Sequence, residues 1–197
     1  PIDENMTMWA TFTDYVNVYS VVGGLAVVLL TLVHGLTFIG LRTTGPVHTR
    51  ALALLKKVYF VLFGGLVVFA VLTYFNTDLF TVRPVATPVF LVCIVLAALL
   101  GFIFANKGKE GWAFTMSGLT IVLTVAMLFV GLFPRVMISS IDPAFNLTID
   151  NAASGQYTLS LMTKISLTLL PFVLGYQIWS YYIFRKRISH KDTVNYE

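Results

Sequence analysis

Five stretches of the chain contain no Asp, Glu, Lys or Arg, and they constrain the fold more than any other feature. They cover residues 16–41, 58–75, 85–105, 111–133 and 165–184. A helix needs roughly 20 apolar residues to cross a bilayer, and all five stretches reach about that length. Because lipid offers no hydrogen-bond partners, each segment must satisfy its own backbone amides, as a helix does. We therefore expect an all-α fold, a polytopic transmembrane helical bundle of five helices.

The charged residues exclude a soluble nucleic-acid-binding protein, although the net charge is +4. Only 11% of the residues are charged, against roughly 25% in soluble domains. The chain has 13 lysines and arginines. If the five stretches cross a membrane, most of these cations fall on one side, and Arg83, Arg135 and Lys164 fall on the other. The first group comprises Arg42, Arg50, Lys56, Lys57, Lys107, Lys109, Arg185, Lys186, Arg187 and Lys191.

This asymmetry predicts the orientation, because positively charged loops stay in the cytoplasm. The N-terminus is expected outside and the C-terminus in the cytoplasm, which agrees with an odd number of crossings. The expected organisation is an outer loop at 1–15, a transmembrane helix at 16–41 and a cytoplasmic loop at 42–57. Four further helices follow at 58–184, with a cytoplasmic tail at 185–197. The opening PIDENMT suggests that the sequence starts partway through a larger protein.

His34 is the one candidate for chemistry inside the five stretches, since imidazole serves as a haem ligand or in a proton relay. The alternative is a neutral histidine that is hydrogen-bonded to a neighbouring helix, and we favour it. No phosphate-binding glycine loop, nucleophile–base pair or metal-spaced histidine cluster accompanies His34. The residues alone therefore indicate a packed membrane subunit without a catalytic centre or metal site of its own.

Small residues at helical spacing mark expected helix contacts, because they let helix backbones approach closely. These residues are Ser20, Gly24, Gly64, Gly65, Ala97 and Gly101. At the outer helix ends, Arg83 and Arg135 are expected to pair with a carboxylate such as Asp78 or Asp142, or with a partner subunit. We favour structural pairing over a ligand contact.

Three stretches resemble subunit II of the cytochrome bd-type quinol oxidases. The first is VVGGLAVVLLTLVHGLTFIGLRTTGPVHTRA, a helix that ends in a basic turn. The second and most specific is GLFPRVMISSIDPAFNLTIDNAASGQYTL, and the third is LLPFVLGYQIWSYYIFRKR. Together they lie within residues 17–187 and are spread over most of the length of the chain.

The resemblance implies eight transmembrane helices in two four-helix halves, of which 16–41 would be the last helix of the first half and 58–184 the whole second half. It also implies a bacterial plasma membrane protein whose partner, subunit I, carries haem b and haem d. The complex would oxidise quinol, reduce dioxygen to water and contribute to the proton gradient. This chain would bind no cofactor alone and would contact membrane lipid and subunit I. The resemblance does not carry a catalytic role onto His34.

Two other function classes stay open. A secondary transporter often has broken helices at the membrane midplane, and Gly64-Gly65 and Pro171 are the hints of one here. A membrane scaffold subunit with no respiratory link is the other alternative.

Overall fold

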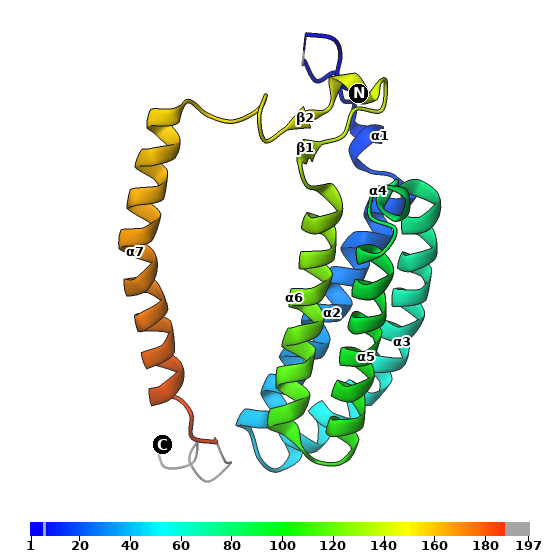
Figure 1. Ribbon diagram of the computed structural model, residues 1–197. Coiled ribbons are helices and arrows are strands. Elements are labelled where there is room, and N and C mark those ends of the chain that lie inside the picture. Colours follow the sequence, from blue (N-terminus) through cyan, green and yellow to red (C-terminus); the bar gives the residue numbers. More distant parts are fainter. Residues whose placement is uncertain (6, 188–197) are drawn as a thin grey trace.

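The computed structural model describes residues 1–5 and 7–187. Short helices flank the long ones at one end of the molecule, where two small strands also lie (Figure 1). The elements in chain order are α1 (Phe12–Tyr15), α2 (Val18–Arg42), α3 (Pro46–Asn76), α4 (Leu79–Val82), α5 (Ala86–Asn106), α6 (Glu110–Leu132), β1 (Arg135–Met137), the 3-10 helix η1 (Pro143–Phe145), β2 (Leu147–Thr148) and α7 (Gln156–Ile183).

Within the described residues, five helices are long and apolar enough to cross a membrane: α2, α3, α5, α6 and α7. The shortest has 21 residues and the longest 31, so each covers the roughly 30 Å hydrocarbon core at 1.5 Å per residue. The prediction of an all-α polytopic transmembrane bundle is confirmed. The orientation of the termini stays a prediction.

α3 begins well before the charge-free stretch at 58–75, and α7 begins well before the one at 165–184. α3 begins at Pro46, so most of the expected loop at 42–57 is helical. Gly45 has a φ of 75°, which glycine adopts without a Cβ clash, and Pro46 then occupies the first helical position. Lys56 and Lys57 lie exposed on this helix and do not end it. A long cation can extend its head group toward water from within a helix, so a charge does not mark a helix boundary.

α2, α3, α5 and α6 form one four-helix bundle (Figure 1). α2 packs on α3 and α6, and α5 packs on α6, whereas α3 and α5 contact each other much less. The largest core cluster gathers around Leu55, Tyr59 and Leu62 of α3, each 1% exposed. Dispersion contacts of this kind hold membrane helices together, because lipid tails remove the hydrophobic driving force.

α7 stands apart from the bundle along most of its length (Figure 1). None of its residues is buried by the described part of the chain. The described bundle includes the helix at 16–41 and leaves out the last one, and the grouping of 58–184 as one four-helix half stays a prediction. Helices joined by short turns pack as antiparallel neighbours, whereas the connection from residue 133 to residue 155 is long enough to let α7 separate. How two halves of a longer protein divide stays a prediction.

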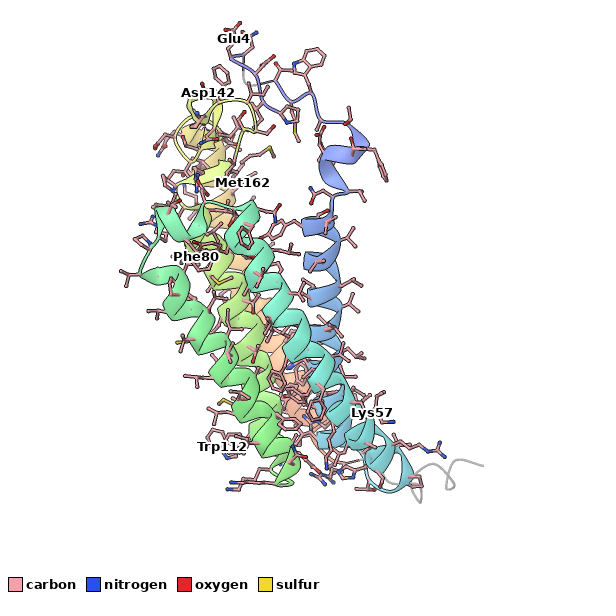
Figure 2. All side chains as sticks on the ribbon, turned by 90° about the vertical axis from the view of Figure 1, so that its right-hand side faces the viewer. Glu4, Lys57, Phe80, Trp112, Asp142 and Met162 are labelled. Carbon is pink, nitrogen blue, oxygen red and sulfur yellow. The ribbon has the colours of Figure 1, made fainter. Side chains whose placement is uncertain are left out.

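The bundle has two opposite ends. The Asp78 end carries residues 1–5 and 7–17, α4, β1 and β2, and the Glu110 end carries the α2–α3 and α5–α6 turns. Figure 2 shows Lys57 and Trp112 near the Glu110 end, with Glu4 and Asp142 beyond the Asp78 end. At the latter, Ser139 Oγ donates a hydrogen bond of 2.8 Å to the Ile2 carbonyl and ties the first residues to the loop after α6.

Candidate functional site

A small polar cluster around His34 lies between α2 and α6. The Nδ1 atom of His34 is 2.9 Å from Ser117 Oγ, and Thr37 Oγ1 is 3.1 Å from the same hydroxyl. Thr37 and Ser117 are 2% and 3% exposed, and the imidazole stacks on Phe114 at 4.4 Å between ring centroids. A Cβ at Gly118 would lie 3.4 Å from the imidazole, so this glycine leaves the ring its space.

Both hydroxyl groups of the cluster donate to backbone carbonyls. Thr37 Oγ1 donates to the His34 carbonyl at 2.7 Å, and Ser117 Oγ donates to the Phe114 carbonyl at 2.8 Å. The Ser117 proton is then committed to a carbonyl, which leaves its oxygen to accept a hydrogen bond from His34 Nδ1–H. Such a network fixes the imidazole ring between the two helices. Within residues 1–5 and 7–187, no group of three or more His, Cys, Asp and Glu side chains is arranged to hold a metal ion.

Asp78 and Arg135 form a two-pronged ion pair at the Asp78 end. Arg135 Nη1 and Nη2 lie 2.5 Å and 3.0 Å from the two carboxylate oxygens of Asp78. The hydrogen bond from Arg135 lowers the pKa of Asp78, and the same contact raises the pKa of Arg135. The pair connects the start of α4 to β1, immediately after α6. A planar guanidinium that holds both carboxylate oxygens fixes the orientation of the two segments.

Arg83 binds the same region by a different contact. Its Nη2 donates a hydrogen bond of 3.0 Å to the Phe133 carbonyl, while its Nε is buried with no partner in the part of the chain that the structure describes. Asp142 does not join either arginine, since its carboxylate accepts from the Ala144 amide at 2.7 Å and caps η1. The structure thus brings Arg83 and Arg135 to one end and leaves Asp142 outside their contacts.

The expected packing residues fall into two groups. Ala97 is 4% exposed and Gly101 is buried, and a Cβ at Gly65 would lie 3.3 Å from Leu29 of α2. Ser20 is exposed and bonded to Asn17 at the start of α2. Cβ atoms at the exposed Gly24 and Gly64 would meet no described atom within 4 Å. The last three positions therefore face away from the other described helices.

Sequence reasoning missed a second ion-pair cluster at the Glu110 end. His48 Nε2 lies 2.5 Å from Glu110 Oε1, and Arg187 pairs with the other oxygen of the same carboxylate. The Glu110 side chain is 10% exposed and links the first turns of α3 and α6 to the residues after α7. The sequence contained one sign of this cluster, since Glu110 is the single acidic residue in the basic turn NKGKE.

An apolar groove of about 520 Å³ lies where α3 and α5 diverge. Phe63 and Leu66 of α3, Leu91 of α5 and Met127 of α6 are among its lining residues. Of the described residues that line it, Thr124 alone has a polar side chain, and its hydroxyl donates to the Thr120 carbonyl at 2.8 Å. The groove suits hydrocarbon and offers no group for acid–base or ligand chemistry.

Comparison with known proteins assigns the family. The family model described as cytochrome bd terminal oxidase subunit II matches residues 1–184. Cytochrome bd ubiquinol oxidase subunit 2 of Bacillus subtilis (strain 168) is 49% identical over 196 residues, which are 100% of this chain and 58% of the relative. Cytochrome bd-I ubiquinol oxidase subunit 2 of Escherichia coli (strain K12) is 27% identical over 223 residues, with 97% of this chain and 59% of the relative covered.

The chain thus spans less than two thirds of the length of these curated relatives. Its five membrane-spanning helices and its bacterial relatives place it in the bacterial plasma membrane as a multi-pass protein. The match extends over nearly every described residue, from the first loop to the end of α7. The chain therefore belongs to the cytochrome bd terminal oxidase subunit II family.

Proposed function

We propose that this chain is part of the haem-free subunit of a respiratory quinol oxidase and acts mainly as the structural partner of the haem-bearing subunit I. The whole complex oxidises quinol, reduces dioxygen to water and contributes to the proton gradient. Haem b and haem d are bound by the partner. The family membership and the printed names of the relatives support the quinol oxidase assignment.

The contact of His34 with Ser117 is the observation that carries the haem-free role. A haem-ligating histidine offers one ring nitrogen to iron and orients the ring through the other. The His34 ring is packed on Phe114 and beside Gly118 of α6, and its Nδ1 is bonded within the same helix pair. These contacts within one helix pair support a structural role for the ring. Helix-to-helix support is the role that the imidazole fits.

The exposed surface of α7 supports a structural role in an assembly. Phe172 is 73% exposed, Ile178 is 70% exposed and Tyr182 is 61% exposed, and all three need lipid or protein around them. Membrane helices associate through packing and interhelical hydrogen bonds. Because the described part of the chain buries no residue of α7, the surface of this helix is available for contact with a partner subunit.

We further propose that the Glu110 end faces the cytoplasm. The exposed or half-buried cations Arg42, Arg50 and Lys57 lie at this end, as do Lys107 and Arg187. Lys191 and the rest of 188–197 lie outside the described residues. The excess of cations supports a cytoplasmic position by the positive-inside rule. The N-terminus would then lie outside the cell.

Continuous helices favour the oxidase subunit over a secondary transporter. α3 runs without a break through Gly64-Gly65, and α7 runs without a break through Pro171. Discontinuous helices build the midplane substrate sites of many transporters, and these two helices do not supply one. A scaffold without a respiratory partner is distinguished from the oxidase subunit by the haem content of the purified complex.

A reduced-minus-oxidised visible spectrum of the complete protein tests the proposal. The protein is affinity-purified in mild detergent with its bound partners, and as an isolated chain. Haem b and d bands are expected in the complex and not in the isolated chain, and they are expected to persist in a His34→Ala complex. Bands in the isolated chain would contradict the haem-free role. A complex without haem would contradict the oxidase assignment.

A further inference from the structure

A small polar cavity separates α2 from the last turns of α7 at the Glu110 end. Its volume is about 270 Å³. The edge of the Tyr181 ring faces the Phe38 ring at 6.4 Å, so this is the level at which α7 approaches α2. The lining residues are Phe38, Arg42, Gln177, Ser180, Tyr181 and Phe184. The cavity combines one cation with an amide and two hydroxyls above aromatic rings.

Arg42 in this cavity is half-buried, and one of its donors has no partner among the described residues. Its Nε is buried and donates to no acceptor among the described residues, and its guanidinium carbon lies 5.6 Å from the centre of the Phe38 ring. Glu110, an acid at the same end, already pairs with His48 and Arg187. A buried donor without an acceptor destabilises the folded state. An anion supplied from outside the chain would remove this destabilisation.

An apolar groove lies on α2, the helix that carries Arg42, farther toward the Asp78 end. Val28, Gly35 and Arg42 are seven residues apart, a spacing that keeps them on one helix face. The groove has a volume of about 350 Å³, and its lining includes Val28, Leu32, Gly35 and Ile39. From Arg42 to Val28 the helix rises about 21 Å, which exceeds half of the roughly 30 Å hydrocarbon core. The groove is long enough for one acyl chain in one leaflet.

We propose that the α2–α7 cavity binds the head group of an anionic phospholipid such as phosphatidylglycerol. The phosphodiester accepts hydrogen bonds from the Arg42 guanidinium, whose planar fork matches two phosphate oxygens. Gln177, Ser180 and Tyr181 have donors for the remaining head-group oxygens. One acyl chain lies along Gly35 and the neighbouring apolar side chains.

Charge and position both favour a lipid over other occupants. Basic pockets between transmembrane helices at the charged face of a membrane protein bind anionic head groups. The groove above Arg42 is open to hydrocarbon, since Val28 is 58% exposed and Leu32 is 41% exposed. Free phosphate would use the cavity and leave the groove empty. A lipid with a net negative charge occupies both the cavity and the groove. A zwitterionic lipid is disfavoured, because its ammonium group would lie close to the positive charge of Arg42.

The test measures lipid-dependent stability of the complete protein, purified with its partners in mild detergent and stripped of bound lipid. A ligand that binds the folded state raises the thermal unfolding midpoint, and the rise grows with the logarithm of ligand concentration over dissociation constant. Dioleoyl phosphatidylglycerol is expected to raise the midpoint, while dioleoyl phosphatidylcholine and inorganic phosphate leave it unchanged. Arg42→Gln is expected to weaken the apparent affinity for phosphatidylglycerol by about tenfold or more. Arg50→Gln, an exposed cation at the same end, is the matched control and retains the response.

A groove-filling variant keeps the proposal testable if Arg42→Gln does not fold. Gly35 is exposed, and a Cβ there would meet no described atom within 4 Å, so Gly35→Leu fits and occupies the groove. It is expected to reduce the affinity for dioleoyl phosphatidylglycerol and to leave that for the dioctanoyl form unchanged. Equal responses to the two dioleoyl lipids, or equal losses in Arg42→Gln and Arg50→Gln, would overturn the proposal. A response to inorganic phosphate alone would assign the cavity to a free anion and also overturn it.

Discussion

The contact between Gly101 and Tyr59 provides a sharp test of how the bundle packs. A Cβ added at Gly101 of α5 would lie 2.6 Å from the hydroxyl oxygen of Tyr59 of α3 and 3.6 Å from the ring carbon that carries it. Tyr59 is 1% exposed, and its hydroxyl has no hydrogen-bond partner in the described part of the chain. The substitution Gly101→Ala therefore forces a clash that removal of one oxygen atom would relieve.

The structure gives the sign and size of each effect. Overpacking a close-packed core costs about 1–3 kcal/mol, and replacing a helical glycine with alanine returns roughly 0.5–1 kcal/mol. Gly101→Ala should therefore destabilise the wild-type protein by up to about 2 kcal/mol. Tyr59→Phe removes a buried, unpaired hydroxyl and should be neutral or stabilising by about 1 kcal/mol. In the Y59F background the new methyl meets an ordinary 3.6 Å contact, so Gly101→Ala should become neutral or stabilising.

The assay is a double-mutant cycle on the complete protein in mild detergent, read as the midpoint of thermal unfolding. One kcal/mol corresponds to about 2–4 °C for chains of 150–250 residues. Gly64→Ala is the control, because Gly64 also lies in a long helix and its added Cβ would meet no described atom within 4 Å. The reasoning is refuted if Gly101→Ala costs the same in both backgrounds, or if Gly64→Ala costs as much as Gly101→Ala.

Three further outcomes are expected. Asp78→Asn should cost about 1 kcal/mol or less of unfolding free energy, because this carboxylate is 41% exposed. Since Arg135 lowers the pKa of Asp78, the stabilisation is full above the ordinary pKa of 3.8 and is lost as pH falls through the lowered pKa. The unfolding curves of wild type and variant should therefore converge in acid. Glu110→Gln removes the ion pairs to Arg187 and His48, so amide hydrogen exchange should speed up in the last turn of α7 and in the first turn of α3, while the rest of the four-helix bundle is unchanged. Ala97→Leu, at a position 4% exposed, should overpack the bundle by about 1–3 kcal/mol and lower the yield of haem-loaded complex, and normal yield and haem content would contradict this.

The membrane-spanning helices were predictable because charge-free length is a local property of the sequence. Their ends were less so. Lys56 lies inside α3 and Lys164 lies inside α7, since a flexible cation tolerates a helical position near the membrane surface. The start of α3 depends on the Gly45-Pro46 pair, a signal that the sequence contains and that a search for charges overlooks.

Contacts between distant helices were only partly predictable. Asp78 was one of two candidate partners for the outer arginines, and the choice between Asp78 and Asp142 depends on where the loop after α6 runs. Ser117 lies 83 residues from His34, and no spacing rule connects them. Gly64 and Gly101 carry the same small-residue signal, yet only Gly101 meets a neighbouring side chain, because the signal does not state which helix face is covered.

The separation of α7 has a consequence for biogenesis. A helix satisfies the backbone groups of its middle turns internally, and in α7 Pro171 lacks an amide hydrogen, so one carbonyl in the preceding turn loses its usual donor. The helix therefore needs only a bilayer to persist after insertion, while its position relative to the bundle is decided later, when other protein surfaces arrive. Membrane insertion of α7 and its docking to other protein surfaces become separate steps. A substitution on the exposed face of α7 would leave insertion unchanged and would impair docking.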